Sequence, residues 1–380
     1  MIFWGCVSIN GTIKGIGLPS KSSRKRLLMQ PKTNQTALFY APKDVRIEAC
    51  PMPQLAQSEL LIQIGSALTC GTDLKCYRRG HPVLLGDKLP APFGHEFAGT
   101  IVGIGGDETD SKWEIGQRVV CANSAPCFDC YYCHQGQHNL CEHLILLNGA
   151  YAQFIKVPAN IAQYNTHLLP DAMPFEIAAF TEPLAVAMRG VEGVGVKAGQ
   201  SVAIVGLGPI GQLMVKVATL LGANVTAIAR SDYKLEMATA FGGAVQTVSI
   251  AEGFDPQAIK QAFSPDGRGF DVVIEAVGLP ETWEKCLHLA RKGGVVHWFA
   301  GCSGGSTVAV DTRLVHYNEL TLYSLFHHTP AFVAKSFEWL ATGKLDPRPL
   351  ISGAFPLANV VDALKAMEQG QGFKYQINEH

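Results

Sequence analysis

The chain has 380 residues, more than one compact core usually holds, so two domains are expected. Hydrophobic residues make up 47% of it and charged residues 17%, which is typical of a globular protein with a buried parallel sheet and excludes a disordered chain. The formal net charge of -1 offers no general attraction to nucleic acid or to an anionic membrane. No apolar run reaches the ~18 residues of a membrane-spanning helix. We therefore expect a soluble protein with neither nucleic-acid nor membrane partners.

The first 33 residues differ from the rest because they are basic and no acidic residue precedes Asp44. A transit peptide has this composition, whereas a signal peptide would carry its charge before the apolar stretch 2–7. An extension ahead of a start at Met29, or an unstructured tail, is the favoured explanation of the segment. We predict that residues 1–33 are an extension outside the fold.

From Ala37 onward, short β-strands separated by Gly and Pro are predicted. The strands are expected at residues 37–40, 45–48, 59–67 and 118–121. This pattern favours an irregular β-rich domain over residues 34–175. Two helices near the end of the chain, at 330–342 and 357–369, are expected to return to it, so that residues 326–380 complete this domain.

Residues 176–325 are predicted to alternate strand and helix, which indicates a parallel sheet in a second domain. The strands are expected at 201–205, 224–229, 245–248, 272–274 and 295–298. The helices are expected at 177–191, at 208–221 and in a segment that runs through Ala240.

Five of the eleven cysteines lie between Cys121 and Cys141, in a chain too long for a small disulfide-stapled fold. Metal binding is the better interpretation, and it favours a reducing compartment, for which we expect the cytoplasm. Four thiolates satisfy tetrahedral zinc and leave no position for water or substrate, so this zinc would be structural. The predicted ligands are Cys127, Cys130, Cys133 and Cys141. Chance clustering or disulfides are the alternatives, and a nucleic-acid-binding zinc ribbon is disfavoured because few Lys or Arg surround the cysteines.

A second, dispersed set of metal-ligand residues comprises Cys70 in C-G-T-D, His95 and Glu96 in G-H-E, and Glu182 in T-E-P-L. Each fragment alone is a weak signal, because a single Cys or His is more often a packed core residue. Mixed sulfur, nitrogen and oxygen ligands nevertheless suit a catalytic zinc, which keeps one position open.

The segment V-G-L-G-P-I-G, from Val205 to Gly211, lies between a predicted strand and a predicted helix. In this setting Gly206 permits a tight turn, Gly208 lets the backbone approach a pyrophosphate, and Gly211 allows close helix packing. The residues between these glycines, Leu207, Pro209 and Ile210, are expected to face the cofactor too. A structural glycine turn without a ligand is the alternative.

The end of the next strand indicates which dinucleotide is bound. An NAD site places an acidic residue there, but this chain has Ala229, followed by Arg230, Ser231 and Lys234. A guanidinium can bind a 2′-phosphate through two hydrogen bonds and an ammonium adds charge, so we expect NADP(H) to be favoured over NAD(H). Asp232 opposes this interpretation, and a solvated Arg230 is the alternative.

From Ala37 onward, the chain resembles the zinc-containing medium-chain dehydrogenase/reductase superfamily. The resemblance rests on the order of its motifs, which are C-G-T-D, G-H-E, the four cysteines, T-E-P-L and G-L-G-P-I-G. The glutamate of T-E-P-L, where its alcohol dehydrogenases commonly have cysteine, resembles the sorbitol and threonine dehydrogenase branch. The resemblance implies a GroES-like catalytic domain, a Rossmann domain at 176–325, two zinc ions per chain and a homodimer or homotetramer. It implies that Cys70 and His95 bind the catalytic zinc and that Glu96 and Glu182 are ligands or exchange with water near it.

The resemblance also implies zinc-assisted hydride transfer between a polyol, sugar, cyclitol or amino-alcohol, or the matching ketone, and the nicotinamide ring. Thr72 is expected to be the first proton acceptor, with helix or turn capping as its alternative role. Many relatives have histidine where this chain has Lys75, so either lysine or water would complete the proton relay.

Two other functions are considered at this point. One is a zinc-independent reductase of quinones or activated alkenes, which the intact Cys70, His95 and Glu96 disfavour. The other is a non-catalytic nucleotide-binding protein, which only Lys75 favours. His327 and His328 are expected to be solvated rather than part of the site.

Overall fold

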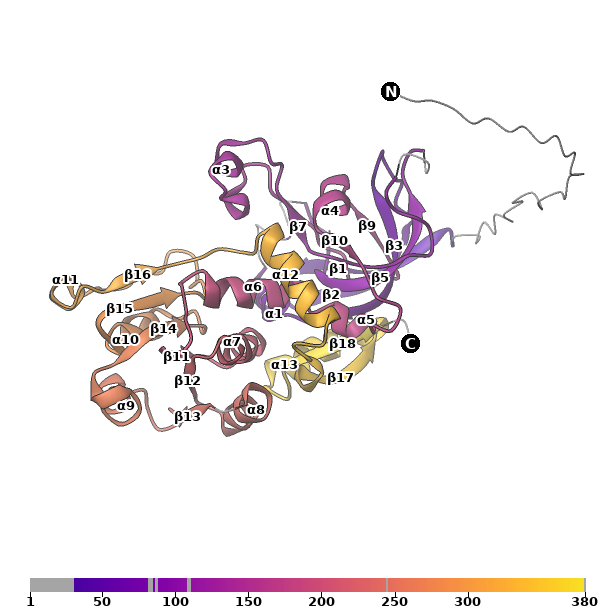
Figure 1. The fold of residues 1–380 in the computed structure, drawn as a ribbon. Helices are drawn as coiled ribbons and strands as arrows, with labels where there is room; N and C mark the ends of the chain where they lie inside the picture. The colour runs from indigo at the N-terminus through magenta and orange to yellow at the C-terminus, as the bar shows by residue number, and fades with distance from the viewer. Residues whose placement is uncertain (1–30, 81–84, 86–87, 108–110, 244, 379–380) are drawn as a thin grey trace, which may run out of the picture. The chain divides into compact units, whose positions relative to one another are not determined.

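The computed structural model describes residues 31–80, 85, 88–107, 111–243 and 245–378 (Figure 1). Its contacts divide the chain into two units, Met1–Lys32 and Thr33–His380. Of the predicted extension, residues 1–33, the structure describes only residues 31–33, so the prediction lies almost entirely outside the described residues. Within the described ranges, no helix combines the length and the apolar character needed to cross a membrane.

Two largely antiparallel sheets occupy the N-terminal part of the second unit, as the short-strand pattern predicts. A three-stranded sheet has the order β2-β1-β4, and a seven-stranded sheet has the order β10-β6-β5-β3-β18-β17 with β9 also paired to β3. Their strands are β1 (Thr33–Ala41), β2 (Asp44–Pro51), β3 (Leu60–Leu68), β4 (Ala91–Pro92), β5 (Glu96–Ile104), β6 (Arg118–Cys121), β9 (Phe154–Val157), β10 (Thr166–Leu168), β17 (Ile351–Pro356) and β18 (Lys374–Asn378). A two-stranded sheet pairs β7 (Ser124–Ala125) with β8 (Ile145–Leu146). Because β18 pairs with β3 and β17 pairs with β18, the end of the chain completes the seven-stranded sheet.

Short helices connect and cover these strands. They are α1 (Gly71–Arg79), α3 (Tyr131–His134), α4 (Ala159–Tyr164), α5 (Phe175–Ala178) and α13 (Val360–Glu368). The longer helix α12 (Pro330–Ala341) packs against α6 (Thr181–Glu192) and α5. Helix α5 packs directly on β3, where a Cβ at Gly65 would lie 2.2 Å from a ring carbon of Phe175. Only glycine allows this approach.

The single helix predicted over 177–191 is wrong, because the structure has two helices there, α5 and α6 (Thr181–Glu192). Pro183 lies in the first turn of α6 and has no N–H to bond to the carbonyl of Ala179. Its ring would also clash with that carbonyl in a continuous helix, so the chain begins a new helix at Thr181.

The third main sheet is parallel throughout, with the order β13-β12-β11-β14-β15-β16, which confirms the predicted Rossmann-type architecture. Its strands are β11 (Ser201–Val205), β12 (Asn224–Ala229), β13 (Gln246–Ser249), β14 (Phe270–Glu275), β15 (Ala290–Trp298) and β16 (Thr321–Tyr323). The chain moves outward from β11 to β13 and then returns to β14 on the other side of β11. The carboxyl end of β11 is therefore a topological switch point, where open α/β sheets bind ligands.

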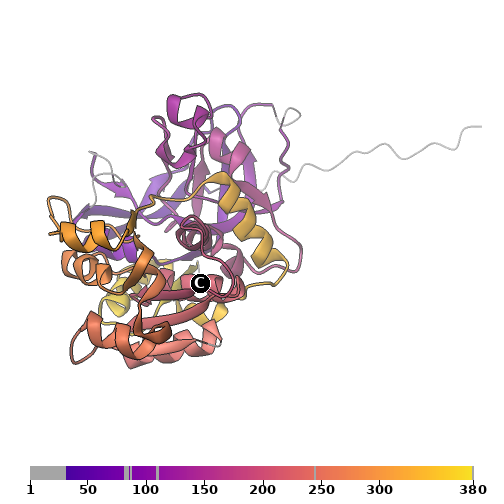
Figure 2. The same cartoon turned by 60° about the vertical axis from the view of Figure 1, so that its left-hand side comes forward.

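Alternate side chains of β11 enter two different hydrophobic cores. Val202 and Ile204 pack with residues of α6 and α7, whereas Ala203 and Val205 pack with residues of α9 and α10. The helices on the two faces are α7 (Pro209–Leu220) and α8 (Asp232–Gly242), and α9 (Pro256–Phe263), α10 (Pro280–Leu287) and α11 (Thr312–Tyr317) (Figure 1 and Figure 2). Burial on both faces explains why this strand reads as one continuous apolar run.

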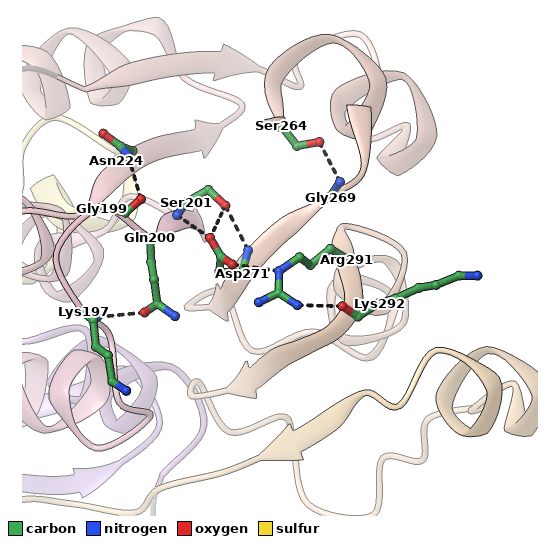
Figure 3. Close-up of polar contacts among 10 residues, drawn as sticks. All are labelled: Lys197, Gly199, Gln200, Ser201, Asn224, Ser264, Gly269, Asp271, Arg291 and Lys292. Carbon is green, nitrogen blue, oxygen red and sulfur yellow. Dashed lines mark hydrogen bonds and ion pairs between the residues drawn. The ribbon is translucent and has the colours of Figure 1, made fainter. Parts of the chain in front are cut away.

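At the amino ends of these strands, polar contacts centred on Asp271 join β11, β14 and β15 (Figure 3). One oxygen of Asp271 accepts hydrogen bonds from the backbone and the hydroxyl of Ser201, both at 2.7 Å. The other accepts from Nε of Arg291 at 2.7 Å. This network fixes the strands at the edge opposite the glycine turn and leaves the carboxyl edge for a ligand.

Candidate active site

The four cysteines of the predicted structural zinc site come together. Their sulfur atoms all lie within 4.8 Å of one another, and all ten cysteines among the described residues are free thiols, so the disulfide alternative has no support there. Backbone N–H groups of Glu142 and His143 point at the sulfurs of Cys130 and Cys141, at 3.4 and 3.3 Å. Burial acts to raise the pKa of Cys130, but hydrogen bonds from backbone N–H groups and from the neighbouring thiols together outweigh burial and lower the pKa to about 6. A thiolate set of this kind fits tetrahedral zinc.

Strand pairing explains how Cys70 meets His95 and Glu96. Strands β3 and β5 are antiparallel with Leu68 opposite Glu96, so Cys70, just after β3, reaches the residues that begin β5. One ligand atom from each of Cys70, His95 and Glu96 lies within 4.8 Å of the others. Glu96 is fully buried and its Oε1 has no hydrogen-bond partner in the described part of the chain. Sulfur, nitrogen and oxygen donors with an unsatisfied buried oxygen fit a catalytic zinc.

Asp73 orients His95, and sequence reasoning did not assign it a role. Its Oδ1 lies 3.0 Å from Nδ1 of His95, and its Oδ2 accepts hydrogen bonds from the Cys70 backbone at 3.0 Å and from the Tyr151 hydroxyl at 2.5 Å. Burial acts to lower the pKa of His95, but the charges and hydrogen bonds of Asp73 and Cys70 together outweigh burial and raise the pKa well above its usual value. The carboxylate at Nδ1 leaves Nε2 for a metal, which is the usual arrangement of metal-binding histidines. The sequence feature that could have revealed Asp73 is its position in the first turn of α1, where it completes a capping box with Cys70.

Lys374 was also missed. Its Nζ donates to Oε2 of Glu96 at 2.5 Å and to the carbonyl of Thr69 at 3.0 Å, and both charged side chains are completely buried. Burial acts to lower the pKa of Lys374, but the charges of Glu96 and Cys70 raise it. The site thus contains a fixed cation beside one of its expected zinc ligands.

One ligand atom of Glu182 lies within 4.8 Å of ligand atoms of His327 and His328. Burial raises the pKa of Glu182 to about 7, and the charges of His95 and Glu96 also act on it, so Glu182 faces these two groups as well. The expectation that the two histidines are solvated is wrong, because His328 is only 2% exposed and His327 is partly buried. Nε2 of His327 lies 2.5 Å from the Ser124 hydroxyl, and Nε2 of His328 lies 3.0 Å from Oδ1 of Asn123. Burial lowers the pKa of His327 to about 3. The partners are more than 200 residues away in sequence, so no local pattern could reveal them.

Thr72 and Lys75 lie one turn apart on α1. The backbone N–H of Thr72 donates to the sulfur of Cys70 at 3.4 Å, which places this residue beside the candidate zinc ligand. Lys75 is exposed, and its charge acts to lower the pKa of Cys302, which burial raises.

The glycine turn after β11 has the expected geometry. Gly206 has φ of +101°, a conformation that favours glycine, and a Cβ at Gly211 would lie 2.0 Å from the carbonyl oxygen of Gly206. Gly208 caps α7 without a side-chain hydrogen bond, and a Cβ there would meet no atom within 4 Å. Leu207 is buried, whereas Pro209 and Ile210 are partly exposed at the first turn. The free N–H groups of a helix start facing open space fit a pyrophosphate.

At the end of β12, Ala229 is buried and Arg230 is exposed. Burial, and then the charge of Arg230, lower the pKa of Lys234, so the two cations lie close enough to repel. Ser231 is partly buried and caps α8 without a side-chain hydrogen bond. An anion between the two cations would relieve their repulsion, and the site offers no carboxylate at position 229 to exclude it.

Comparisons with known proteins agree with this geometry. Residues 56–170 match the alcohol dehydrogenase GroES-like domain, and residues 209–342 match the zinc-binding dehydrogenase family. The chain is 31% identical over 353 residues to an L-threonine 3-dehydrogenase of Bacillus licheniformis, covering 89% of this chain and 97% of that one. It is 28% identical over 350 residues to a sorbitol dehydrogenase of Bacillus subtilis, covering 90% and 95% of the two chains.

Solved structures of dehydrogenases are also similar to this chain. A zinc-binding dehydrogenase of Sinorhizobium meliloti bound to NADP aligns with a TM-score of 0.82 at 26% identity, covering 92% of this chain and 100% of that one. An alcohol dehydrogenase from Thermus sp. ATN1 aligns with a TM-score of 0.81 at 26% identity, covering 90% and 99% of the two chains.

The chain therefore belongs to the family of zinc-binding medium-chain alcohol dehydrogenases. Its similarity to sorbitol and threonine dehydrogenases confirms the branch predicted from the glutamate of T-E-P-L.

Proposed function

We propose that this protein is a zinc-dependent dehydrogenase that transfers a hydride between a secondary alcohol and NADP(H). The substrate would be a polyol, sugar, cyclitol or amino-alcohol, or the matching ketone. The observation that carries the proposal is the convergence of Cys70, His95 and Glu96 within 4.8 Å. A zinc-independent reductase would have no need for these three buried ligand groups.

In this proposal Cys70, His95 and Glu96 hold the catalytic zinc, Glu182 lies near it, and the four clustered cysteines hold the structural zinc. When bound, the catalytic zinc supplies Lewis-acid activation of a substrate oxygen. Asp73 keeps the ring of His95 oriented, and Lys374 compensates the charge of Glu96. The hydroxyl of Thr72 would accept the substrate proton, since among the described residues it makes no hydrogen bond that would have to break. Lys75, one turn along α1 and exposed, would pass the proton toward solvent.

The cofactor proposal rests on the turn at Gly206, Gly208 and Gly211 and on the cations Arg230 and Lys234. The N–H groups at the start of α7 would bind the pyrophosphate, and the backbone of Leu207 to Ile210 would line it. Arg230 and Lys234, with Ser231 between them, would bind the 2′-phosphate of NADP(H) beside the small Ala229.

We also propose a homo-oligomer, dimer or tetramer, in a reducing compartment such as the cytoplasm. Strand β16 is at an edge of the parallel sheet, and the nearby Tyr317 is 73% exposed. Free thiols at all ten described cysteines suit a reducing environment.

The test combines zinc per chain, measured by elemental analysis, with NADPH and NADH titrations followed by cofactor fluorescence. About two zinc ions per chain and tighter binding of NADPH support the proposal. A single zinc that the variant Cys70→Ser retains would contradict the catalytic site, and tighter binding of NADH would contradict the cofactor assignment. Turnover of a polyol and sugar panel then identifies the substrate.

A further inference from the structure

The hydroxyl of Tyr151 donates to the carboxylate that faces His95. It lies 2.5 Å from Oδ2 of Asp73, while the other oxygen of this carboxylate, Oδ1, lies 3.0 Å from Nδ1 of His95. The carbonyl oxygen of Leu68, at 3.2 Å, is the more distant acceptor for the same proton. Because a hydrogen bond to a charged acceptor is shorter and stronger than one to a neutral carbonyl, the proton of Tyr151 is directed at Asp73.

Burial makes this hydrogen bond a lasting one. Tyr151 is completely buried and Asp73 is 2% exposed, so bulk water does not compete for the bond. Burial, and then the charge of Asp73, raise the pKa of Tyr151 well above its usual value, which keeps the phenol protonated as a donor. Oδ2 also accepts from the backbone N–H of Cys70 at 3.0 Å. These two donors fix the rotation of the carboxylate, and that rotation decides whether Oδ1 faces His95.

The fold sets the position of the Tyr151 ring from several sides. The backbone N–H of Tyr151 donates to the carbonyl of Phe93 at 3.0 Å, and its carbonyl accepts from the N–H of Ala37 at 2.8 Å. The ring meets that of Phe93 edge to face, with centroids 5.5 Å apart. It also lies against Gly94, where a Cβ would come within 2.7 Å of its Cγ. Since Gly94 directly precedes His95, the segment that carries this candidate zinc ligand packs on the ring whose hydroxyl binds Asp73.

We propose that Tyr151 is a positioning residue of the catalytic zinc site, whose hydroxyl fixes Asp73 so that the carboxylate holds Nδ1 of His95 and leaves Nε2 for the metal. The inference rests on the proposed function, because it takes His95 to be a zinc ligand. Loss of an outer hydrogen bond that orients a metal-binding histidine typically weakens metal binding. Tyr151 adds a further layer, since it orients the carboxylate itself. Phenylalanine at this position would keep the ring and lose the hydroxyl alone.

The experiment is a time course of zinc loss from the full-length chain to a chelator, with the remaining zinc counted by elemental analysis. Tyr151→Phe is expected to lose the catalytic zinc about tenfold faster than the wild type and to lose the zinc of the four-cysteine lobe at the wild-type rate. The matched control is Tyr40→Phe, which removes a hydroxyl that donates to Oε1 of Glu48 at 2.6 Å, and it should behave as the wild type. Equal or slower loss of the catalytic zinc in Tyr151→Phe overturns the proposal.

A double-mutant cycle separates positioning through Asp73 from packing of the ring. Asp73→Asn should itself speed loss of the catalytic zinc, because a neutral amide replaces the carboxylate at Nδ1 of His95. If Tyr151 acts through Asp73, then Tyr151→Phe should change the rate of zinc loss by less than about twofold when Asp73→Asn is already present. An undiminished effect in that background would show that the carboxylate does not transmit the substitution, and it would overturn the proposal.

Cobalt bound in place of the catalytic zinc provides a spectroscopic measurement that does not depend on activity. Its ligand-field absorption responds to the geometry of the ligands, so Tyr151→Phe should shift these bands relative to the wild type. Tyr40→Phe should leave them unchanged. Unshifted bands in Tyr151→Phe would show that the hydroxyl does not orient His95.

Failure of this inference and failure of the proposed function are distinguishable. Cys70→Ser should remove the catalytic zinc and leave the zinc of the four-cysteine lobe in place. If Cys70→Ser keeps both zinc ions, the proposed catalytic site is wrong and the inference falls with it. If Cys70→Ser loses one zinc ion while Tyr151→Phe behaves as the wild type, only the role of Tyr151 is wrong.

Discussion

Lys374 and Glu96 form an ion pair in which both side chains are completely buried, with Nζ 2.5 Å from Oε2. Glu96 begins β5 and Lys374 begins β18, and β3 lies between these two strands in the sheet. The pair therefore joins the metal-ligand end of β5 to the last strand of the same sheet.

Replacing Lys374 with methionine should destabilise the fold strongly. The substitution keeps most of the side-chain volume but removes the ion-pair partner of the buried Glu96 carboxylate, which costs about 3 kcal/mol in the free energy of unfolding. Urea denaturation of the full chain measures this loss. The control is Lys365→Met, which removes an exposed pair with Asp362 and should cost about 0.5 kcal/mol or less. Equal losses in the two variants would show that Lys374 does not compensate Glu96.

Replacing Cys130 with serine should lower zinc content by about one ion per chain and reduce stability, because a structural zinc contributes directly to folding. Elemental analysis and the thermal unfolding midpoint measure the two effects. The metal at Cys70, His95 and Glu96 should remain. Selective loss of that metal would contradict the assignment of the four-cysteine lobe.

Alanine substitutions at Gly208 and Gly211 should have different effects on cofactor binding and on stability. At Gly208 a methyl group meets no protein atom within 4 Å, so Gly208→Ala should fold normally but weaken cofactor binding by blocking the pyrophosphate. At Gly211 the same methyl group would lie 2.0 Å from the Gly206 carbonyl, so Gly211→Ala should lower both the unfolding midpoint and cofactor affinity. Unchanged NADPH binding in Gly208→Ala would contradict the proposed cofactor position.

Replacing Arg230 with aspartate should shift cofactor preference toward NADH by about tenfold or more. The variant would remove the proposed charge-assisted hydrogen bond to the 2′-phosphate, worth about 1.5–3 kcal/mol, and would add repulsion. Fluorescence titrations with NADPH and NADH give the ratio of dissociation constants. Arg268→Asp, at an exposed position outside the glycine turn, is the control and should leave the ratio unchanged.

Acid should destabilise the parallel-sheet domain through His297. This residue of β15 is buried, and burial lowers its pKa from 6.5 to about 4. Because the folded state binds the proton less tightly than the unfolded state, stability is full above pH 6.5 and falls as the pH drops toward 4. Between pH 7.5 and pH 5 the loss from this one group is about 2 kcal/mol.

Urea denaturation of wild type and His297→Asn at both pH values measures this effect. The variant should lose less stability on acidification than the wild type, although its absolute stability at neutral pH is lower. Its asparagine is polar and can keep a hydrogen bond to the carbonyl of Gly190, which Nδ1 of His297 contacts at 3.0 Å. Parallel losses in the two proteins would show that another group titrates in this range.

The sequence predicted strands well where apolar runs are sharply bounded. The limits expected for Arg118–Cys121, Ser201–Val205 and Asn224–Ala229 agree with the structure at every residue. Helices α1, α9 and α10 were not predicted, since each has only eight or nine residues. Strand β18 was missed because its buried Lys374 breaks the apolar pattern, and its burial is made tolerable by Glu96 and the Thr69 carbonyl.

Some residues of the candidate site could be predicted from the sequence and others could not. Cys70, His95, Glu96 and the four cysteines could be found because residue type and spacing carry the chemistry of metal binding. Asp73 had a weak local signal as a capping residue. His327 and His328 had none, because their burial depends on Asn123 and Ser124, which come from β7 and the residue before it.

The pairing of Lys374 with Glu96 also constrains the order of events as the chain is made. Glu96 leaves the ribosome 278 residues ahead of the lysine that compensates it. The whole parallel sheet, from β11 to β16, is synthesised in that interval and can fold first from contacts that are closer in sequence. The sheet that carries Glu96 cannot be completed, and Glu96 cannot pair with Lys374, until β18 has been synthesised. The parallel-sheet domain can therefore fold before the sheet that holds the candidate metal ligands.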